Sequence, residues 1–519
     1  MNRIIELDLT PAQAFDPEQF RQTVNERLKI SSDDSRHFQI LKRSIDARSR
    51  NVVVRVVGEI IEPDKIDKPA SINERYHDVS HKKPVIIVGA GPAGLFAALR
   101  LIESGMKPIV LERGKDVRSR RRDLAAINKD HIVNPESNYC FGEGGAGTYS
   151  DGKLYTRSKK RGDIKRILDI FHAHGAMDDI LYDAHPHIGT NKLPNIVSAI
   201  SKTITDNGGE VHFNCKATDF IIKEMEMLGV KTEHEEFYGE AVILATGHSA
   251  RDIFKLLHSR NVHMEAKPFA LGLRVEHAQN FIDRVQYHCA TDRDAYLPAA
   301  PYSLVHQAKV NGKERGVFSF CMCPGGFIVP SATSPGEIVV NGMSPSRRDS
   351  RFANSGIVVT VDDSDFCIYE KAGPLSALKY QSIIEQKACI TGRQEAPAQR
   401  LLDFVERKTS SSLLDSSYQP GLVSADLHAI LPRVISDALV QGFKSFGLKM
   451  KGYLTNEAQV VGVESRTSSP VKIPRDKETL EHVQIKRFYP CGEGAGYAGG
   501  IVSAAMDGER VAEAIVKRN

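Results

Sequence analysis

The sequence contains no long apolar run: no stretch in its 519 residues approaches the roughly 20 apolar residues of a membrane-spanning helix. The N-terminus, MNRIIELDLTPAQAF, also lacks the apolar core of a secretory signal. The eight cysteines are scattered along the chain without the spacing of a disulfide framework, a distribution typical of reduced thiols. These absences predict a cytoplasmic protein with no membrane partner.

The sequence also lacks a large excess of either sign of charge. Lys and Arg number 69 against 65 Asp and Glu, and the net charge of +4 is too small to indicate nucleic acid as a partner. Basic residues gather between Arg36 and Arg55, where six of them stand against Asp46. A solvated sheet face explains this cluster, but a docking surface for RNA or a protein stays open, so nucleic acid is not excluded. The sequence does not indicate an oligomeric state.

Metal-ligand spacing is missing as well. His172 and His174 stand two apart on an expected helix, so their side chains diverge, and His185 and His187 bracket a proline in an expected loop. No cysteine or carboxylate at ligand spacing supports either pair. We therefore predict no metal site.

One stretch, residues 84–114, organises the rest of the chain. A short apolar β-branched run leads into Gly89, Gly91 and Gly94 in G-x-G-x-x-G spacing, an apolar helical pattern follows, and a second apolar run ends in Glu112. Gly89 allows a tight turn, Gly91 lets a pyrophosphate approach the backbone, and Gly94 lets helix and strand pack closely. The helix N-terminus would face the phosphates, and Glu112 would accept both hydroxyl protons of an adenosine ribose. The stretch predicts a dinucleotide site.

Two features follow this stretch directly. Five arginines occupy ten positions from Arg113 to Arg122, and a solvated helix face explains most of them. Only Arg113 and Arg118 are predicted to reach phosphates. Residues 142–150 are then rich in glycine, and so many free backbone amides predict a cradle around a ligand.

Two later signals strengthen the prediction. An apolar run ends in Ala245-Thr246-Gly247, where the chain would pass tightly beside a dinucleotide. Near the C-terminus a strand feeds the turn CGEGAGYAGG at 491–500 before an expected helix. Its carboxylate, Glu493, could bind a ribityl hydroxyl, and the helix N-terminus could stabilise negative charge on a reduced flavin.

The predicted fold class is α/β: a parallel sheet with a β-meander binds the dinucleotide, and a smaller α+β unit precedes it. Between the two later signals the pattern changes to antiparallel β and helix, including a hairpin at Asn311-Gly312. The predicted domains are residues 1–80 (N-terminal α+β domain and linker), 81–267 (first part of the dinucleotide domain), 268–449 (substrate or cap domain) and 450–519 (second part).

At this point the motifs resemble a known family. GAGPAG with Glu112, ATG at 245–247 and CGEGAGYAGG resemble the glutathione-reductase-type FAD fold. More narrowly, SIDAR at 44–48, NPESNYCFGEGGAGTYSDGKL, PFALGLRVEH and CMCPGGFIVP followed by NGMS resemble the bacterial uncharacterised FAD-dependent dehydrogenase family, of NAD(FAD)-utilising type. The resemblance spans essentially the whole chain and implies bound FAD without a settled substrate. One departure is Glu493, which stands where the wider fold usually has Asp.

The motifs and the resemblance together assign a set of FAD contacts. These are Gly89, Gly91, Pro92, Ala93, Gly94, Glu112, Arg113, Gly142, Gly144, Gly145, Ala146, Gly147, Ser150, Ala217, Ala245, Thr246, Gly247, Gly492, Glu493, Gly499, Gly500 and Ile501.

The remaining question is the chemistry. Apart from the spacing within the turn at 491–500, no second G-x-G-x-x-G follows a strand, so a dedicated NAD(P)H domain is not expected, although NAD(P)H stays open as a transient reductant. The weak candidates for an acid or base are Lys153, Arg274 and Glu276, the last two also explained by a buried ion pair. Cys321 and Cys323 lie two apart on an expected strand, where ordinary packing or a thiol pair facing the flavin would each fit.

The sequence predicts an FAD-dependent oxidoreductase, a dehydrogenase or reductase that exchanges hydride at flavin N5 with a small organic substrate. Two alternatives stay open: an RNA- or tRNA-directed flavoenzyme, and a flavin-binding electron-transfer protein.

Overall fold

The computed structural model describes residues 4–29, 37–62, 72–156 and 162–518. A parallel sheet carries the central stretch, in the strand order β22-β10-β4-β5-β6. Residues of β4 alternate between two cores: Val85 and Ile87 face the core of α3, α6 and α14, and Ile86 and Val88 face the core of the meander and α7. An apolar run that is buried on both faces is what a central parallel strand requires. The strands are β4 (Pro84–Val88), β5 (Lys107–Leu111), β6 (Glu210–His212), β10 (Val242–Leu244) and β22 (Phe488–Pro490).

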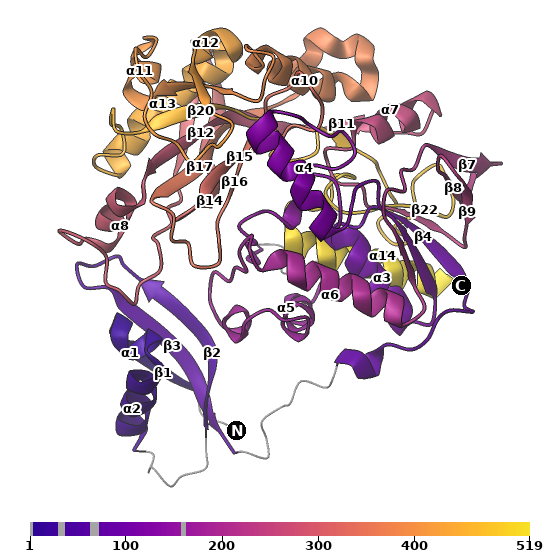
Figure 1. Cartoon of the computed structure of the whole chain (residues 1–519), viewed down its shortest axis with the longest axis horizontal. Helices are drawn as coiled ribbons and strands as arrows, with labels where there is room; N and C mark the ends of the chain where they lie inside the picture. Colours follow the sequence, from indigo (N-terminus) through magenta and orange to yellow (C-terminus); the bar gives the residue numbers. More distant parts are fainter. Residues whose placement is uncertain (1–3, 30–36, 63–71, 157–161, 519) are drawn as a thin grey trace.

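Helices cover one face of this sheet and a β-meander with α7 covers the other (Figure 1). The helices of this part are α3 (Pro92–Glu103), α4 (Val117–Asp130), α5 (Ile164–Ala173), α6 (Leu193–Asp206), α7 (Arg251–Ser259) and α14 (Ile501–Arg518). The meander strands are β7 (Asp219–Lys223), β8 (Glu226–Lys231) and β9 (Glu236–Tyr238). α3 and α14 pack closely because Gly508 leaves no side chain between them: a Cβ there would lie 2.1 Å from the Ala93 carbonyl oxygen.

The second large sheet forms the cap, in the order β13-β14-β17-β12-β20-β18-β19. Its strands are β12 (Phe269–Ala278), β13 (Val305–Val310), β14 (Lys313–Cys323), β17 (Phe352–Val361), β18 (Ala396–Arg400), β19 (Leu422–Ser424) and β20 (Gln459–Glu464). A hairpin of β15 (Phe327–Pro330) and β16 (Val340–Met343) lies beside it. The cap helices are α8 (Gln279–Tyr287), α9 (Asp363–Phe366), α10 (Ser376–Ala388), α11 (Leu401–Glu406), α12 (Leu427–Ile430) and α13 (Arg433–Lys449).

The cap sheet corrects the boundary predicted between residues 449 and 450. β20 lies beyond that boundary, yet it pairs with β12 and β18 inside the cap sheet. The cap sheet therefore extends to Glu464, and only the chain after it returns to the parallel sheet through β22. The sequence of a short strand such as β20 does not indicate which sheet the strand joins. The other predicted boundaries stay predictions.

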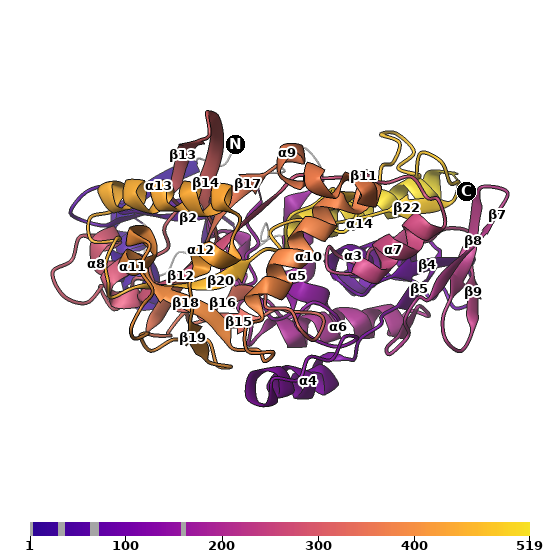
Figure 2. The same ribbon diagram turned by 90° about the horizontal axis from the view of Figure 1, so that it is seen from above.

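α10 connects the two large sheets. Ala377, Tyr380 and Ile384 belong to the cap core, and Leu378 on the same helix belongs to the core of the meander and α7. Seen from above, α10 lies between the cap helix α13 and the parallel sheet (Figure 2). A helix buried on two sides holds both sheets in one arrangement. A short pair, β11 (Glu265–Ala266) with β21 (Val471–Lys472), also joins the two crossings between the sheets.

The N-terminal unit is a small antiparallel sheet, β1-β3-β2, with two helices on one face. Its elements are β1 (Ile4–Leu9), α1 (Pro11–Phe15), α2 (Pro17–Leu28), β2 (His37–Asp46) and β3 (Val53–Ile61). Its contacts with the rest of the chain include Arg43, whose Nε donates to Asp183 Oδ1 at 2.7 Å. Among the described residues, no helix is both long enough and apolar enough to span a bilayer.

Candidate functional site

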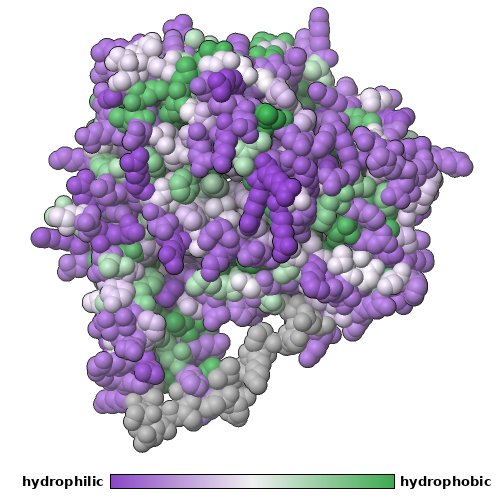
Figure 3. Space-filling model, in the orientation of Figure 1, coloured by the Kyte–Doolittle hydropathy of each residue, from purple (hydrophilic) through white to green (hydrophobic). Residues whose placement is uncertain are grey.

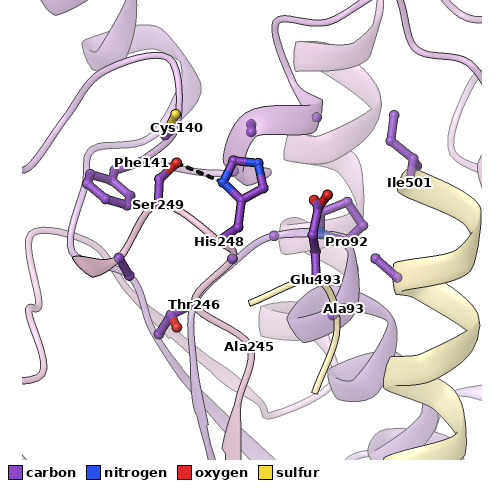
Figure 4. A pocket seen from close by; sticks show the side chains of 18 of the residues that line it. Pro92, Ala93, Cys140, Phe141, Ala245, Thr246, His248, Ser249, Glu493 and Ile501 are labelled. Carbon is purple, nitrogen blue, oxygen red and sulfur yellow. Dashed lines mark hydrogen bonds between the residues drawn. The ribbon is translucent and has the colours of Figure 1, made fainter. Parts of the chain in front are cut away.

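One cavity of about 390 Å³ collects segments that lie far apart in the sequence. It opens at the carboxyl ends of β4, β5 and β10, the edge at which open parallel sheets bind ligands. Figure 4 shows Pro92 and Ala93 at the start of α3, Thr246 and His248 after β10, and Glu493 converging on it. The cap supplies the remaining wall with Phe320, Cys321, Asn341, Arg466 and Thr467.

Most of the predicted FAD contacts line this cavity. They are Gly89, Gly91, Pro92, Ala93, Glu112, Arg113, Gly145, Ala146, Gly147, Ser150, Ala217, Ala245, Thr246, Gly247, Glu493, Gly499, Gly500 and Ile501. The structure brings them together from both sides of the cap insertion.

Four predicted contacts do not line the cavity, because their backbone packs against protein. A Cβ at Gly94 would lie 2.0 Å from the Gly89 carbonyl oxygen, which is the close helix–strand contact expected there. A Cβ at Gly142 would lie 2.6 Å from Arg120 Cδ, and one at Gly144 would lie 2.0 Å from Thr148 Oγ1. A Cβ at Gly492 would likewise lie 2.9 Å from the Ala93 Cβ. Of the predicted cradle, residues 142–150, only the second half, residues 145–150, therefore faces the cavity.

The cavity fits a dinucleotide because several of its glycines face open space. A Cβ at Gly91, Gly247, Gly499 or Gly500 would meet no atom within 4 Å, so a ligand has room to approach the backbone at these positions. Gly91 caps α3, and Gly499 and Gly500 directly precede α14. The positive ends of both helix dipoles therefore point at the same space. This arrangement suits the pyrophosphate of FAD at α3 and the electron-rich edge of its flavin at α14.

Glu112 is held more firmly than the sequence indicates. Its Oε2 accepts from the Ala90 N–H, and its Oε1 accepts from the N–H groups of Gly114 and Gly142, each at 2.9 Å. A carboxylate offers about four lone-pair positions. Three of these positions serve the backbone, and the contact of Glu112 with the ribose hydroxyls stays a prediction.

The predicted phosphate role of Arg113 also needs correction. Its guanidinium forms a two-point contact with Asp252, with N–O distances of 2.9 Å, and its Nε donates to Glu136 at 2.7 Å. It lies over the Phe141 ring, 4.4 Å from the centroid. Two carboxylates neutralise this cation, so Arg113 shapes the cavity wall and offers no free charge to a phosphate. Arg118 is exposed on α4 and does not reach the cavity.

Arg120 has a structural role beside the cavity that sequence reasoning missed. Its side chain is fully buried and donates to the carbonyl oxygens of Asn138, Tyr139, Glu143 and Gly145 at 2.8–2.9 Å. Burial lowers the pKa of this guanidinium. Figure 3 shows the hydrophilic surface over α4, where the neighbouring arginines were expected to lie. The helical spacing of Arg120 from the buried Leu124 and Ile127 was the available signal.

His248, Glu493, Lys153 and Asp151 are among the ionisable side chains that line the cavity. Burial, with Arg466 and Arg251 nearby, lowers the pKa of His248 to about 4, so its imidazole is neutral, and its Nδ1 lies 2.9 Å from Ser249 Oγ. Burial raises the pKa of Glu493 to about 7, although Lys267 opposes the shift. Lys153 contacts Asp151 at 3.3 Å, and Asp151 is held by Arg348 at 2.8 Å. His248 lies in the turn that follows β10, and its side chain lines the cavity.

The other weak candidates lie outside the cavity. Arg274 is completely buried and pairs with Glu464 at 2.7 Å. Glu276 lines a different cavity, where it accepts from the Ser417 hydroxyl. A buried Arg–Glu pair thus exists, but its acid is Glu464, and Glu276 is not placed to act on a ligand of the first cavity. Among the described residues, no group of three or more His, Cys, Asp or Glu side chains could hold a metal ion.

Three family models match this chain. Residues 82–128 match an FAD binding domain, residues 268–467 match the C-terminal domain of an FAD-dependent protein, and residues 1–60 match a domain of unknown function. An uncharacterized protein of Clostridium beijerinckii is 39% identical over 513 residues, which cover 95% of this chain and 94% of the relative. The chain belongs to this family of FAD-dependent proteins. FAD is its cofactor.

Solved structures with a low overall similarity include an oxidase and a reductase-like protein. The match to glycine oxidase of Bacillus cereus has 15% identity and a TM-score of 0.31, and it covers 84% of this chain and 96% of the oxidase chain. The match to a geranylgeranyl bacteriochlorophyll reductase-like protein of Thermoplasma acidophilum has 13% identity and a TM-score of 0.35, and it covers 84% of this chain and 78% of that protein.

Proposed function

We propose that this FAD-binding protein is an oxidoreductase that exchanges a hydride with a small organic substrate. The observation that carries the proposal is the shared cavity: the dinucleotide-binding segments form one side and the cap sheet forms the other. FAD, when bound, supplies hydride acceptance or donation at flavin N5. A second wall facing that cofactor gives a substrate a place to be held.

The residues of the cavity have separable tasks under this proposal. The backbone at Gly91 and the N-terminus of α3 would hold the pyrophosphate, and Glu493 would meet the ribityl chain. The N-terminus of α14, with Gly499 and Gly500 uncovered, would stabilise negative charge on the reduced ring. Lys153 places a cation at the cap side, where it can orient an anionic or carbonyl group of the substrate.

The RNA-directed alternative is weakened by ion pairs at the N-terminal sheet. Of the basic cluster expected there, Arg43 pairs with Asp183, Arg48 pairs with Asp46, and Arg55 pairs with Glu6 and Asp8. Arg36 lies outside the described residues. Three of the six basic residues of the cluster are thus paired with carboxylates, which leaves less free charge for a phosphate backbone. The electron-transfer alternative requires a flavin edge open to a partner, whereas the cap covers this cavity with its own residues.

Anaerobic flavin reduction tests the proposal. Heating the purified protein should release FAD, and FMN or no flavin would contradict the cofactor site. NADH, NADPH and a panel of small amines, hydroxy acids and alcohols are then mixed with the holoenzyme while flavin absorbance is followed. Bleaching by at least one small molecule is the expected result. Reduction by a protein donor alone, with no response to any small donor and no reoxidation by small unsaturated acceptors, would favour electron transfer instead.

A further inference from the structure

The cap contributes an irregular strand end to the cavity. Along β14, Phe320 pairs with Gly356 and Cys323 pairs with Asn354, so three steps on β14 oppose two steps on β17. The extra residue makes a β-bulge, and Cys321 within it has a left-handed φ of 46°. In a regular strand, residues two apart lie about 6.6 Å apart at Cα, near the upper limit for a disulfide. The bulge departs from this regular spacing at Cys321.

The bulge brings two thiols together. Cys323 Sγ lies 3.2 Å from the Cys321 carbonyl oxygen, and the two thiols are within hydrogen-bonding reach of each other. Both are free in the structure. Their surroundings differ: Cys321 lines the FAD cavity, whereas Cys323 is fully buried behind it. One thiol is thus placed to meet a ligand and the other to close on the first.

Two cations hold the bulge and polarise the pair. Lys153 Nζ donates to the Met322 carbonyl oxygen between the cysteines, and Arg274 Nη1 donates to the Cys321 carbonyl oxygen at 3.3 Å. The hydrogen bond from Cys323 lowers the pKa of the Cys321 thiol; burial opposes the shift, and Lys153 and Arg274 reinforce it. That hydrogen bond and burial raise the pKa of Cys323. The cavity-facing sulfur is therefore the better nucleophile.

We propose that Cys321 and Cys323 are a redox-active thiol pair that exchanges two electrons with FAD. In the oxidising direction, the Cys321 thiolate and the Cys323 thiol form one S–S bond as the Cys323 S–H bond breaks. The two electrons and the proton released reduce FAD to its anionic two-electron form, so charge and atoms balance. The reverse step reduces the disulfide. The proposal goes beyond the oxidoreductase function and depends only on bound FAD.

A reductive titration of the air-oxidised holoenzyme tests this pair. Dithionite added anaerobically should deliver four electron equivalents per FAD to the wild-type protein, two for the flavin and two for the disulfide. Cys321→Ser and Cys323→Ser should each take up two. Cys367→Ser, which removes an exposed cysteine outside the cavity, should still take up four. Two equivalents in the wild-type protein would overturn the proposal.

Alkylation of the wild-type protein gives a readout that does not depend on the variants folding. Air-oxidised holoenzyme is denatured, treated with iodoacetamide and digested, and the peptide holding both cysteines is weighed. We expect both positions to resist iodoacetamide until a dithiol reductant is added, and both to react afterwards. Full alkylation before reduction would overturn the proposal. A thiol result of either kind leaves the small-molecule bleaching test untouched, so the two failures can be told apart.

Discussion

Two arginines near the dinucleotide motif exchange the roles that their positions in the sequence indicate. Arg113 follows Glu112 directly, yet its guanidinium forms ion pairs with the carboxylates of Glu136 and Asp252. Arg120 stands among arginines of an exposed helix, yet its side chain points inward and holds the glycine-rich segment by its carbonyl oxygens. A glycine-rich segment has a high conformational entropy in the unfolded chain. The fixed hydrogen bonds of Arg120 offset that cost before any ligand binds.

Replacing Arg120 by Met should therefore release the glycine-rich segment. Hydrogen bonds to a charged group contribute about 1.5–3 kcal/mol each, and Met restores none of them. We expect a lower melting temperature, loss of most bound FAD, and new proteolytic cleavage between residues 138 and 150. Arg122→Met, two positions on and exposed, is the matched control and should behave as wild type. Normal FAD content in the Arg120 variant would show that the segment orders itself by other means.

Glu493 gives the apoprotein a pH dependence near neutrality. Its pKa of about 7 lies above the usual 4.5, so the folded state binds the proton more tightly than the unfolded chain. The stability gained from this is complete below pH 4.5 and is lost as pH rises through 7, by up to about 3 kcal/mol.

Glu493→Gln should flatten that part of the stability curve. Denaturant unfolding of the apoprotein at several pH values between 4.5 and 8 measures it. Glu509, whose pKa burial also raises to about 7, remains in both proteins, so the difference between the two curves isolates Glu493. Parallel curves for variant and wild type would contradict the assignment.

At the scale of elements, two helices from opposite ends of the chain begin at the same cavity. α3 follows β4 directly, and α14 begins some 400 residues later, yet they pack against each other through Gly508 and Ala93. Their N-termini give the cavity two positive dipole ends without a charged side chain. The close approach of a ligand then depends on the glycines at these ends.

Gly91→Ala should test this approach with little cost to the fold. Gly91 has an ordinary φ of −77°, and its added Cβ would meet no protein atom within 4 Å. We expect an unchanged circular dichroism spectrum and at least a tenfold loss in FAD affinity, equivalent to about 1.4 kcal/mol. Gly316→Ala on β14, where the Cβ makes only an ordinary contact at 3.4 Å, is the control. Gly145→Val is less clean, because the left-handed φ of 62° at Gly145 strains any side chain.

At the scale of the whole molecule, a buried ionic cluster joins the two large sheets. Glu385 of α10 accepts from Arg251 of α7 at 2.7 Å and from Arg466, just after β20, at 3.0 Å. Glu337 contacts the same two arginines, each at 3.0 Å. Arg466 also lines the FAD cavity. The relative position of cap and dinucleotide domain is thus tied to the shape of the site.

Glu385→Gln should loosen this connection. Removing one charge of a buried cluster costs about 3–5 kcal/mol, because the remaining charges lose their partner. We expect reduced stability in denaturant and faster FAD release, measured by the rise of free-flavin fluorescence. Glu406→Gln breaks an exposed pair with Lys408 and should change stability by less than about 0.5 kcal/mol. Equal FAD release rates in the two variants would show that the ionic cluster does not influence the cofactor site.

The sequence alone determined the parts of this protein whose cause is local. Neighbouring residues dictate the backbone geometry of three segments: residues 84–114 with their strand–glycine–helix order, Gly247 after an apolar strand, and the glycine turn before α14. These segments meet at one cavity. The family matches confirm FAD as the cofactor.

The tertiary structure decided what depends on residues distant in the chain. It placed β20 in the cap sheet, turned Arg120 inward, neutralised Arg113, and bent β14 so that Cys321 reaches the cavity beside Cys323. Burial, ion pairing and strand register each require a partner from another element. No local pattern names that partner, because the free energy of these contacts arises only when the chain has packed.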